Sequence, residues 1–144
     1  MRRYLIAALI LAAPFTTGSL VIAQQRTPSA TGAEVYIISP KDGATVHNPV
    51  RVQFGLKGMG IAPAGIKFDN TGHHHLLIDT DPPADMSAPL PATDKTVHFG
   101  KGQTETTLTL SPGKHTLQLL LADASHIPHE PPLLSKKITI TVAQ

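Results

Sequence analysis

The chain contains no cysteine and no tryptophan among its 144 residues. The fold must therefore hold without disulfide bonds, and thiolate chemistry and cysteine-based metal sites are excluded. Aromatic residues make up only 4% of the chain, and Tyr4 and Phe15 lie in the N-terminal segment discussed next. Stacking platforms are therefore scarce, which counts against the binding of glycans.

Long hydrophobic runs are also missing, since a membrane-spanning helix needs about 20 apolar residues. The apolar stretch at residues 4–15 is shorter, follows two arginines and precedes Val21-Ile22-Ala23. This order is typical of a secretory signal peptide that is cleaved after Ala23. An uncleaved anchor is the alternative, but Pro14 and Gly18 interrupt the run. We therefore expect a periplasmic or secreted protein with no stable membrane anchor after cleavage.

The excess of positive charge is lost when this N-terminal segment is removed. The formal charge of +2 equals the contribution of Arg2 and Arg3, so the mature chain carries equal numbers of basic and acidic side chains. No basic stripe remains for binding a phosphate backbone, and nucleic acid is not expected as a partner.

Short β-branched runs separated by proline and glycine fill the mature chain. Seven of them read as strands with no helical stretch between: residues 34–39, 50–56, 74–79, 96–99, 105–110, 115–121 and 135–142. This pattern predicts an all-β, immunoglobulin/fibronectin-like sandwich of about seven strands, with a small barrel or jelly roll as the alternative. The predicted organisation is a signal peptide (1–23), a flexible leader (24–32) and one β-sandwich domain (33–144).

Histidine is what the sequence has in excess, with eight residues. His73, His74 and His75 are consecutive at the start of the third predicted strand, where alternation places His73 and His75 on one face and His74 on the other. His126 and His129 lie in the Pro-rich stretch 123–132, which is expected to be a loop.

The predicted topology brings these two groups together. In such a sandwich the third and sixth strands are antiparallel neighbours, so the loop after the sixth strand lies beside the start of the third. Met59 falls in a loop at this same end, and His98 points there from the fourth strand, which we expect in the other sheet. His47 and His115 fall at the opposite end, where a structural role is expected.

Imidazoles in this arrangement suit zinc or copper. The predicted metal ligands are His73, His74, His75, His126 and His129, with Met59, His98 and Asp123 as possible additions. A thioether at Met59 would favour copper, and Asp123 could instead orient an imidazole. The alternative is that these histidines are ordinary polar residues at strand ends.

Catalytic signatures are absent from the sequence, which lacks the Gly-x-Ser-x-Gly, P-loop and His-Glu-x-x-His patterns. Ser125, His126 and Asp123 are too close in one loop to form a catalytic triad, and no oxyanion hole accompanies them. We therefore do not expect an enzyme, although a metal-dependent hydrolase or redox enzyme is a third hypothesis.

Four segments together carry a family resemblance: 58–65 (GMGIAPAG), 71–79 (TGHHHLLID), 112–117 (PGKHTL) and 123–129 (DASHIPH). With them the chain resembles the bacterial family catalogued as domain of unknown function 4399. The resemblance implies an exported bacterial protein, hence the periplasm, and implies that the clustered histidines and His115 matter to the family.

Two functions follow as hypotheses. The first is a periplasmic copper- or zinc-binding protein that acts in metal storage, delivery or resistance. The second is a non-catalytic envelope interaction module that binds a protein or glycan partner through the same loops.

Overall fold

Ten β-strands and no helix make up the part of the chain that the computed structural model describes, residues 25–144. The expected signal peptide, residues 1–23, lies outside this range. The strands in chain order are β1 (Glu34–Ser39), β2 (Thr45–Val46), β3 (Val50–Lys57), β4 (Gly60–Ile61), β5 (Thr71–Ile78), β6 (Thr96–His98), β7 (Glu105–Leu108), β8 (Gly113–Ala122), β9 (Pro128–Leu134) and β10 (Ile138–Val142).

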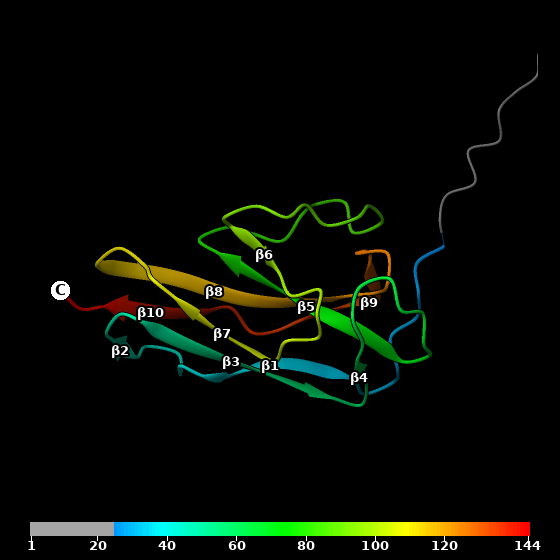
Figure 1. Ribbon diagram of the computed structural model, residues 1–144, viewed down its shortest axis with the longest axis horizontal. Helices are drawn as coiled ribbons and strands as arrows, with labels where there is room; N and C mark the ends of the chain where they lie inside the picture. The colour runs from blue at the N-terminus through cyan, green and yellow to red at the C-terminus, as the bar shows by residue number, and fades with distance from the viewer. Residues whose placement is uncertain (1–24) are drawn as a thin grey trace, which may run out of the picture.

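The strands form two packed sheets (Figure 1). The smaller sheet has the order β1-β3-β7, and the larger has the order β2-β10-β8-β5-β4, with β6 paired to β5 and β9 paired to β8. The expected all-β sandwich is therefore confirmed, and the seven expected strands are joined by three further ones, β2, β4 and β9. The third and sixth expected strands, β5 and β8, are antiparallel neighbours as predicted.

Two expectations about strand placement are wrong. The fourth predicted strand, β6, does not belong to the smaller sheet but pairs with β5. Residues 128–132 are not loop, because β9 begins at Pro128 and pairs with β8 through Leu121 and Leu133. Both corrections enlarge the sheet that carries the histidines.

The main core lies between the two sheets. Alternation along β5 turns Leu76 and Ile78 inward, and β8 contributes Leu117, Leu119 and Leu121. The smaller sheet adds Val52 and Phe54 from β3, all nearly inaccessible to solvent. Burying several large apolar side chains is the main source of stability for a domain without disulfides, at about 1.5–3 kcal/mol each.

A second, smaller core lies on the outer face of the larger sheet. The segment 79–95 runs above this face, away from the smaller sheet (Figure 1). Leu90 of this segment packs with Leu120 and Ala122, the β8 residues that point outward. The outer face of the larger sheet is therefore covered in part by the segment 79–95.

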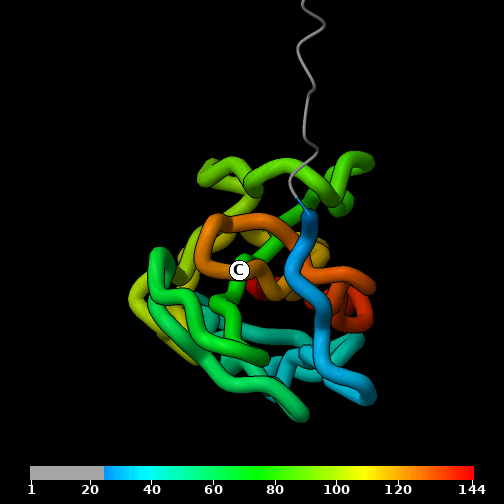
Figure 2. The backbone as a smooth tube through the Cα atoms, turned by 90° about the vertical axis from the view of Figure 1, so that its right-hand side faces the viewer, coloured from blue at the N-terminus to red at the C-terminus, as the bar shows by residue number. Residues whose placement is uncertain are grey.

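Residues 25–29 lie along β9 (Figure 2). The Ser29 amide donates to the Glu130 carbonyl at 3.0 Å, and the Glu130 amide donates to the Thr27 carbonyl at 2.9 Å. The stretch 24–32, expected to be a flexible leader, is thus held against β9 at these positions.

Candidate metal centre

The three consecutive histidines of β5 point to two different faces of the larger sheet. His74 points into the core between the sheets, where its ring lies 5.1 Å from that of Phe54 in an edge-to-face contact. His73 and His75, one residue to either side, therefore point to the outer face. Antiparallel pairing with β8 sets His73 opposite Ala122 and His75 opposite Leu120.

Four imidazoles meet on this outer face: His73, His75, His98 and His126. One ligand nitrogen from each lies within 4.8 Å of the corresponding atom of every other. The ring centroids are separated by 4.8 Å to 6.1 Å over all six pairs. His73 Nε2 and His126 Nδ1 are 3.1 Å apart.

His98 joins the cluster because β6 lies next to β5. The pairing places His98 directly opposite His75, and directly opposed residues in an antiparallel pair share one face. Gly100 leaves room for the ring, since a Cβ atom at this position would lie 2.2 Å from His98 Cε1. The sequence prediction named His98 only as a possible ligand because it put the fourth strand in the wrong sheet.

His126 comes from the turn between β8 and β9. Its backbone has a φ of 65°, the left-handed region that non-glycine residues rarely adopt. The turn is held by Asp123, whose Oδ1 accepts hydrogen bonds from the amides of Ser125 at 2.8 Å and Ile127 at 3.1 Å. These bonds stabilise the turn on both sides of His126.

The N-terminal segment braces the same turn (Figure 2). Thr27 Oγ1 donates to Asp123 Oδ2 at 2.6 Å. The Arg26 guanidinium donates to the carbonyl of Pro128 at 3.0 Å, to the carbonyl of His129 and to the carboxylate of Glu130. Arg26 and Thr27 thus donate hydrogen bonds to four backbone or side-chain acceptors around the His126 turn.

Burial favours the neutral form of three of these imidazoles, those of His73, His75 and His98. Desolvation, together with the proximity of the neighbouring imidazoles, lowers the pKa of His73 to about 4 and that of His75 to about 3. Desolvation, followed by the proximity of His126, also lowers the pKa of His98. Neutral imidazole is the form that binds metal ions, so protons do not have to be displaced from these rings at pH 7.

The cluster has the size of a mononuclear site. A tetrahedral zinc ion with Zn–N bonds of about 2.0–2.1 Å holds its nitrogens about 3.3–3.4 Å apart. The observed limit of 4.8 Å exceeds this by about 1.5 Å, a gap that side-chain rotations would have to close on binding. Four imidazole ligands suit Zn(II) and Cu(II) in particular.

Several predicted ligands lie outside the cluster. His74 is in the inter-sheet core, and Met59 packs against that core rather than on the outer face. His129 is buried beside Gly72, on the inner side of β5, with no hydrogen-bond partner for either ring nitrogen. Asp123 uses its carboxylate to hold the His126 turn.

His115 forms a separate polar contact at the other end of β8. Its Nδ1 donates to Asp79 Oδ2 at 2.7 Å, and its Nε2 donates to the Ser111 carbonyl at 2.8 Å. Ser111 Oγ is 3.4 Å from the same Nε2, so the three residues resemble a catalytic triad in outline. However, a ring with both nitrogens donating cannot accept a proton from serine. The structural role expected for His115 matches this geometry.

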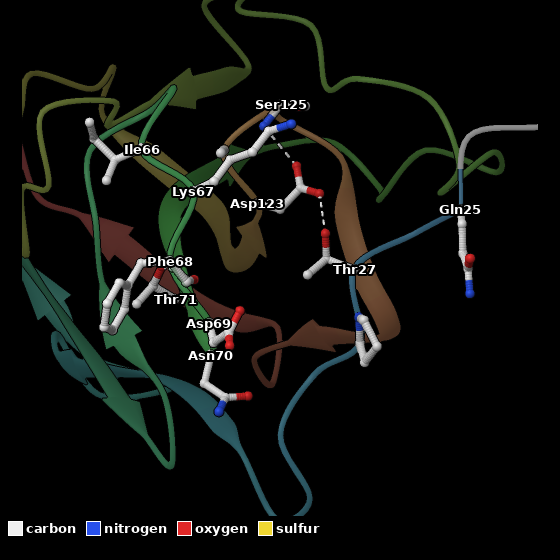
Figure 3. Close-up of a pocket in the computed structure, with 12 residues that line it drawn as sticks. Gln25, Thr27, Ile66, Lys67, Phe68, Asp69, Asn70, Thr71, Asp123 and Ser125 are labelled. Carbon is white, nitrogen blue, oxygen red and sulfur yellow. Dashed lines mark hydrogen bonds between the residues drawn. The ribbon is translucent and has the colours of Figure 1, made fainter.

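A cleft of about 510 Å³ opens next to the His126 turn. It lies between the segment 66–71, the N-terminal residues and Asp123 (Figure 3). Phe68 and Ile66 line it although 75% and 55% of their surfaces are exposed. This is the one place near the four imidazoles, among residues 25–144, where large apolar side chains are strongly exposed.

Together these features define a β-sandwich with a four-histidine cluster on one sheet. Residues 52–143 match the family described as domain of unknown function 4399 (DUF4399). The match covers more than half of the chain, so the chain belongs to this family. Comparisons with curated proteins and with solved structures find no match. In residues 25–144 there is no helix long and apolar enough to cross a membrane.

Proposed function

We propose that this is a periplasmic metal-binding protein that holds one copper or zinc ion in storage, delivery or resistance. The supporting observation is the convergence of His73, His75, His98 and His126 from three separate parts of the chain. Of the predicted ligands, the proposed set keeps His73, His75 and His126 and leaves out His74 and His129. Of the three possible additions, it includes His98 and leaves out Met59 and Asp123.

The arrangement of the four rings favours binding over catalysis. His73 and His75 are at most 1% exposed, whereas His98 and His126 are partly accessible. An ion would therefore enter past His98 and His126 and rest on the two buried rings. Four protein nitrogens complete a tetrahedral shell, and a catalytic zinc site keeps a position open for water.

Metal analysis of the protein purified in its exported form tests the proposal. After dialysis against Zn(II) or Cu(II), we expect one ion per chain and a strong loss in the His98→Gln/His126→Gln double variant. These two rings are the accessible ones, so their replacement leaves the buried part of the fold intact. The His47→Gln variant is the matched control, because His47 is exposed and lies outside the cluster.

Two outcomes would refute a metal-binding function. One is a wild-type protein that retains no stoichiometric metal after dialysis. The other is metal retention by the double variant equal to that of wild type and of His47→Gln. A thermal unfolding curve for each variant separates loss of ligands from loss of the fold.

The alternative function is a non-catalytic envelope interaction module. The cleft next to the His126 turn favours it, since exposed Phe68 and Ile66 are available to a protein partner (Figure 3). Immobilised wild-type protein would then recover an envelope protein that the Phe68→Ser variant does not. Recovery of the same proteins by both would count against this function.

A further inference from the structure

The chain has a second methionine besides Met59 in the described range, and it lies on the face of the four imidazoles. Met86 belongs to the segment 79–95, which covers the outer face of the larger sheet (Figure 1). It is half-buried and packs against the small outer core of Leu90, Leu120 and Ala122. Met59 packs instead against the core between the sheets.

Every member of that small core borders the four-histidine cluster. Leu120 is the pairing partner of His75, and Ala122 is the pairing partner of His73. Side chains directly opposed in an antiparallel pair have Cβ atoms about 4.5–5.5 Å apart. A side chain packed against either β8 residue is therefore one neighbour away from an imidazole of the cluster.

Leu90 makes the third connection. Its amide donates to the carbonyl of His126 at 2.8 Å, which ties the segment 79–95 to the turn that carries this ligand. Within the segment, Asp85 Oδ1 accepts hydrogen bonds from the amide of Ser87 at 2.8 Å and from its hydroxyl at 2.6 Å. This tight turn surrounds Met86 and fixes the backbone from which its side chain extends.

Thioether sulfur changes which metal ion a histidine site prefers. Imidazoles alone suit Zn(II) and Cu(II), whereas a soft thioether ligand selects Cu(I). Methionine has an unbranched side chain with three rotatable bonds, so it can reach an ion without movement of the sheet.

We propose that Met86 supplies a thioether ligand with which the four-histidine site also binds monovalent copper. The inference rests on the proposed metal-binding function and adds monovalent copper to the ions that the site would hold. It assigns Met86 the role that the sequence suggested for Met59, because Met86 is the one of the two methionines in residues 25–144 that lies on the outer face.

Cu(I) affinity, measured under anaerobic reducing conditions by competition with a chromophoric Cu(I) chelator, tests this inference. We expect Met86→Leu to weaken Cu(I) binding by about tenfold or more, with Zn(II) and Cu(II) binding unchanged. Leucine keeps the volume and apolar character that the packing needs. Met59→Leu is the matched control and is expected to bind all three ions like wild type.

The NMR signals of the methionine methyl groups test directly whether Met86 binds the ion. With ¹³C-methyl methionine and Ag(I) as a diamagnetic probe for Cu(I), the Met86 resonance is expected to shift on titration and the Met59 resonance to stay. Equal Cu(I) affinity of wild type and Met86→Leu, or a Met86 resonance that does not move, would overturn the inference.

The two proposals fail in distinguishable ways. A protein that binds Zn(II) or Cu(II) but not Cu(I) refutes the role of Met86 and leaves the metal-binding function standing. A protein that binds none of the three ions refutes both. Unchanged Zn(II) affinity in Met86→Leu shows that the variant is folded.

Discussion

Gly100 allows the architecture of the candidate site to be tested without removing a ligand. A Cβ atom at this position would lie 2.2 Å from Cε1 and 2.4 Å from Nε2 of His98. Both distances are far below the carbon contact distance of about 3.5 Å, so the imidazole has to leave its place. The backbone of Gly100 is not in the left-handed region, so alanine adds no backbone strain, and its other close contact is with Ala64 Cβ at 3.2 Å.

The expected loss of metal affinity in Gly100→Ala corresponds to the displacement of one ligand. Displacing His98 leaves three of the four imidazoles in place. Loss of the groups that orient a metal ligand costs about 10–100-fold in affinity, or about 1.4–2.8 kcal/mol of binding free energy. We expect a loss of this size for Gly100→Ala. Gly60→Ala is the control, because its Cβ would meet only Thr71 Cγ2, at 3.4 Å.

Zinc affinity by isothermal titration calorimetry provides the measurement, in the wild-type and His98→Ala backgrounds. If the steric argument is right, Gly100→Ala weakens binding only where His98 is present. Wild-type affinity in Gly100→Ala, or the same loss in both backgrounds, would show that His98 is not a ligand held in place by Gly100.

Three further predictions concern the rest of the domain. The hydrogen bond to Asp79 raises the pKa of His115 above 6.5, so its contribution to stability is complete below pH 6.5 and is lost as the pH rises through the raised value; urea unfolding across pH 6–9 is expected to show this loss in wild type and not in Asp79→Asn. Thr27→Val removes the hydrogen bond to Asp123 and is expected to weaken metal binding through the His126 turn, by about 10–100-fold in calorimetry; unchanged affinity would mean that the N-terminal segment does not position His126. Metal at 100 times its dissociation constant is expected to add about 2.7 kcal/mol to the unfolding free energy of the wild-type protein, and a melting temperature that ignores metal would contradict the site.

Local periodicity was sufficient to predict most of the fold. The alternation at Val50, Val52 and Phe54 placed β3 correctly, and the weaker alternation in β8 matches its central position. From strand order alone, His73 and His126 were expected at the same end, and they are 3.1 Å apart between ring nitrogens. Such contacts follow from the order and direction of the strands, which short sequence patterns predict well.

The choice of sheet for β6 could not be predicted in the same way. A three-residue strand has too little pattern to show which edge it joins, and this decided whether His98 belonged to the cluster. His126 joins the cluster and His129 does not because of one turn, in which Asp123 stabilises the left-handed conformation of His126. Side-chain hydrogen bonds of this kind are tertiary information that a sequence pattern does not contain.

Buried nitrogens without partners occur both inside and outside the cluster, so burial alone does not define the site. His73 Nδ1, His75 Nδ1 and His98 Nε2 lack hydrogen-bond partners, as do both ring nitrogens of His74 and His129. Each such atom costs about 1–3 kcal/mol of stability. The ring of His74 faces Phe54, where no second ligand could share an ion. His73, His75 and His98 differ from His74 and His129 in their position: one ring nitrogen of each lies within 4.8 Å of one another and of a nitrogen of His126, where a single ion could bind several rings.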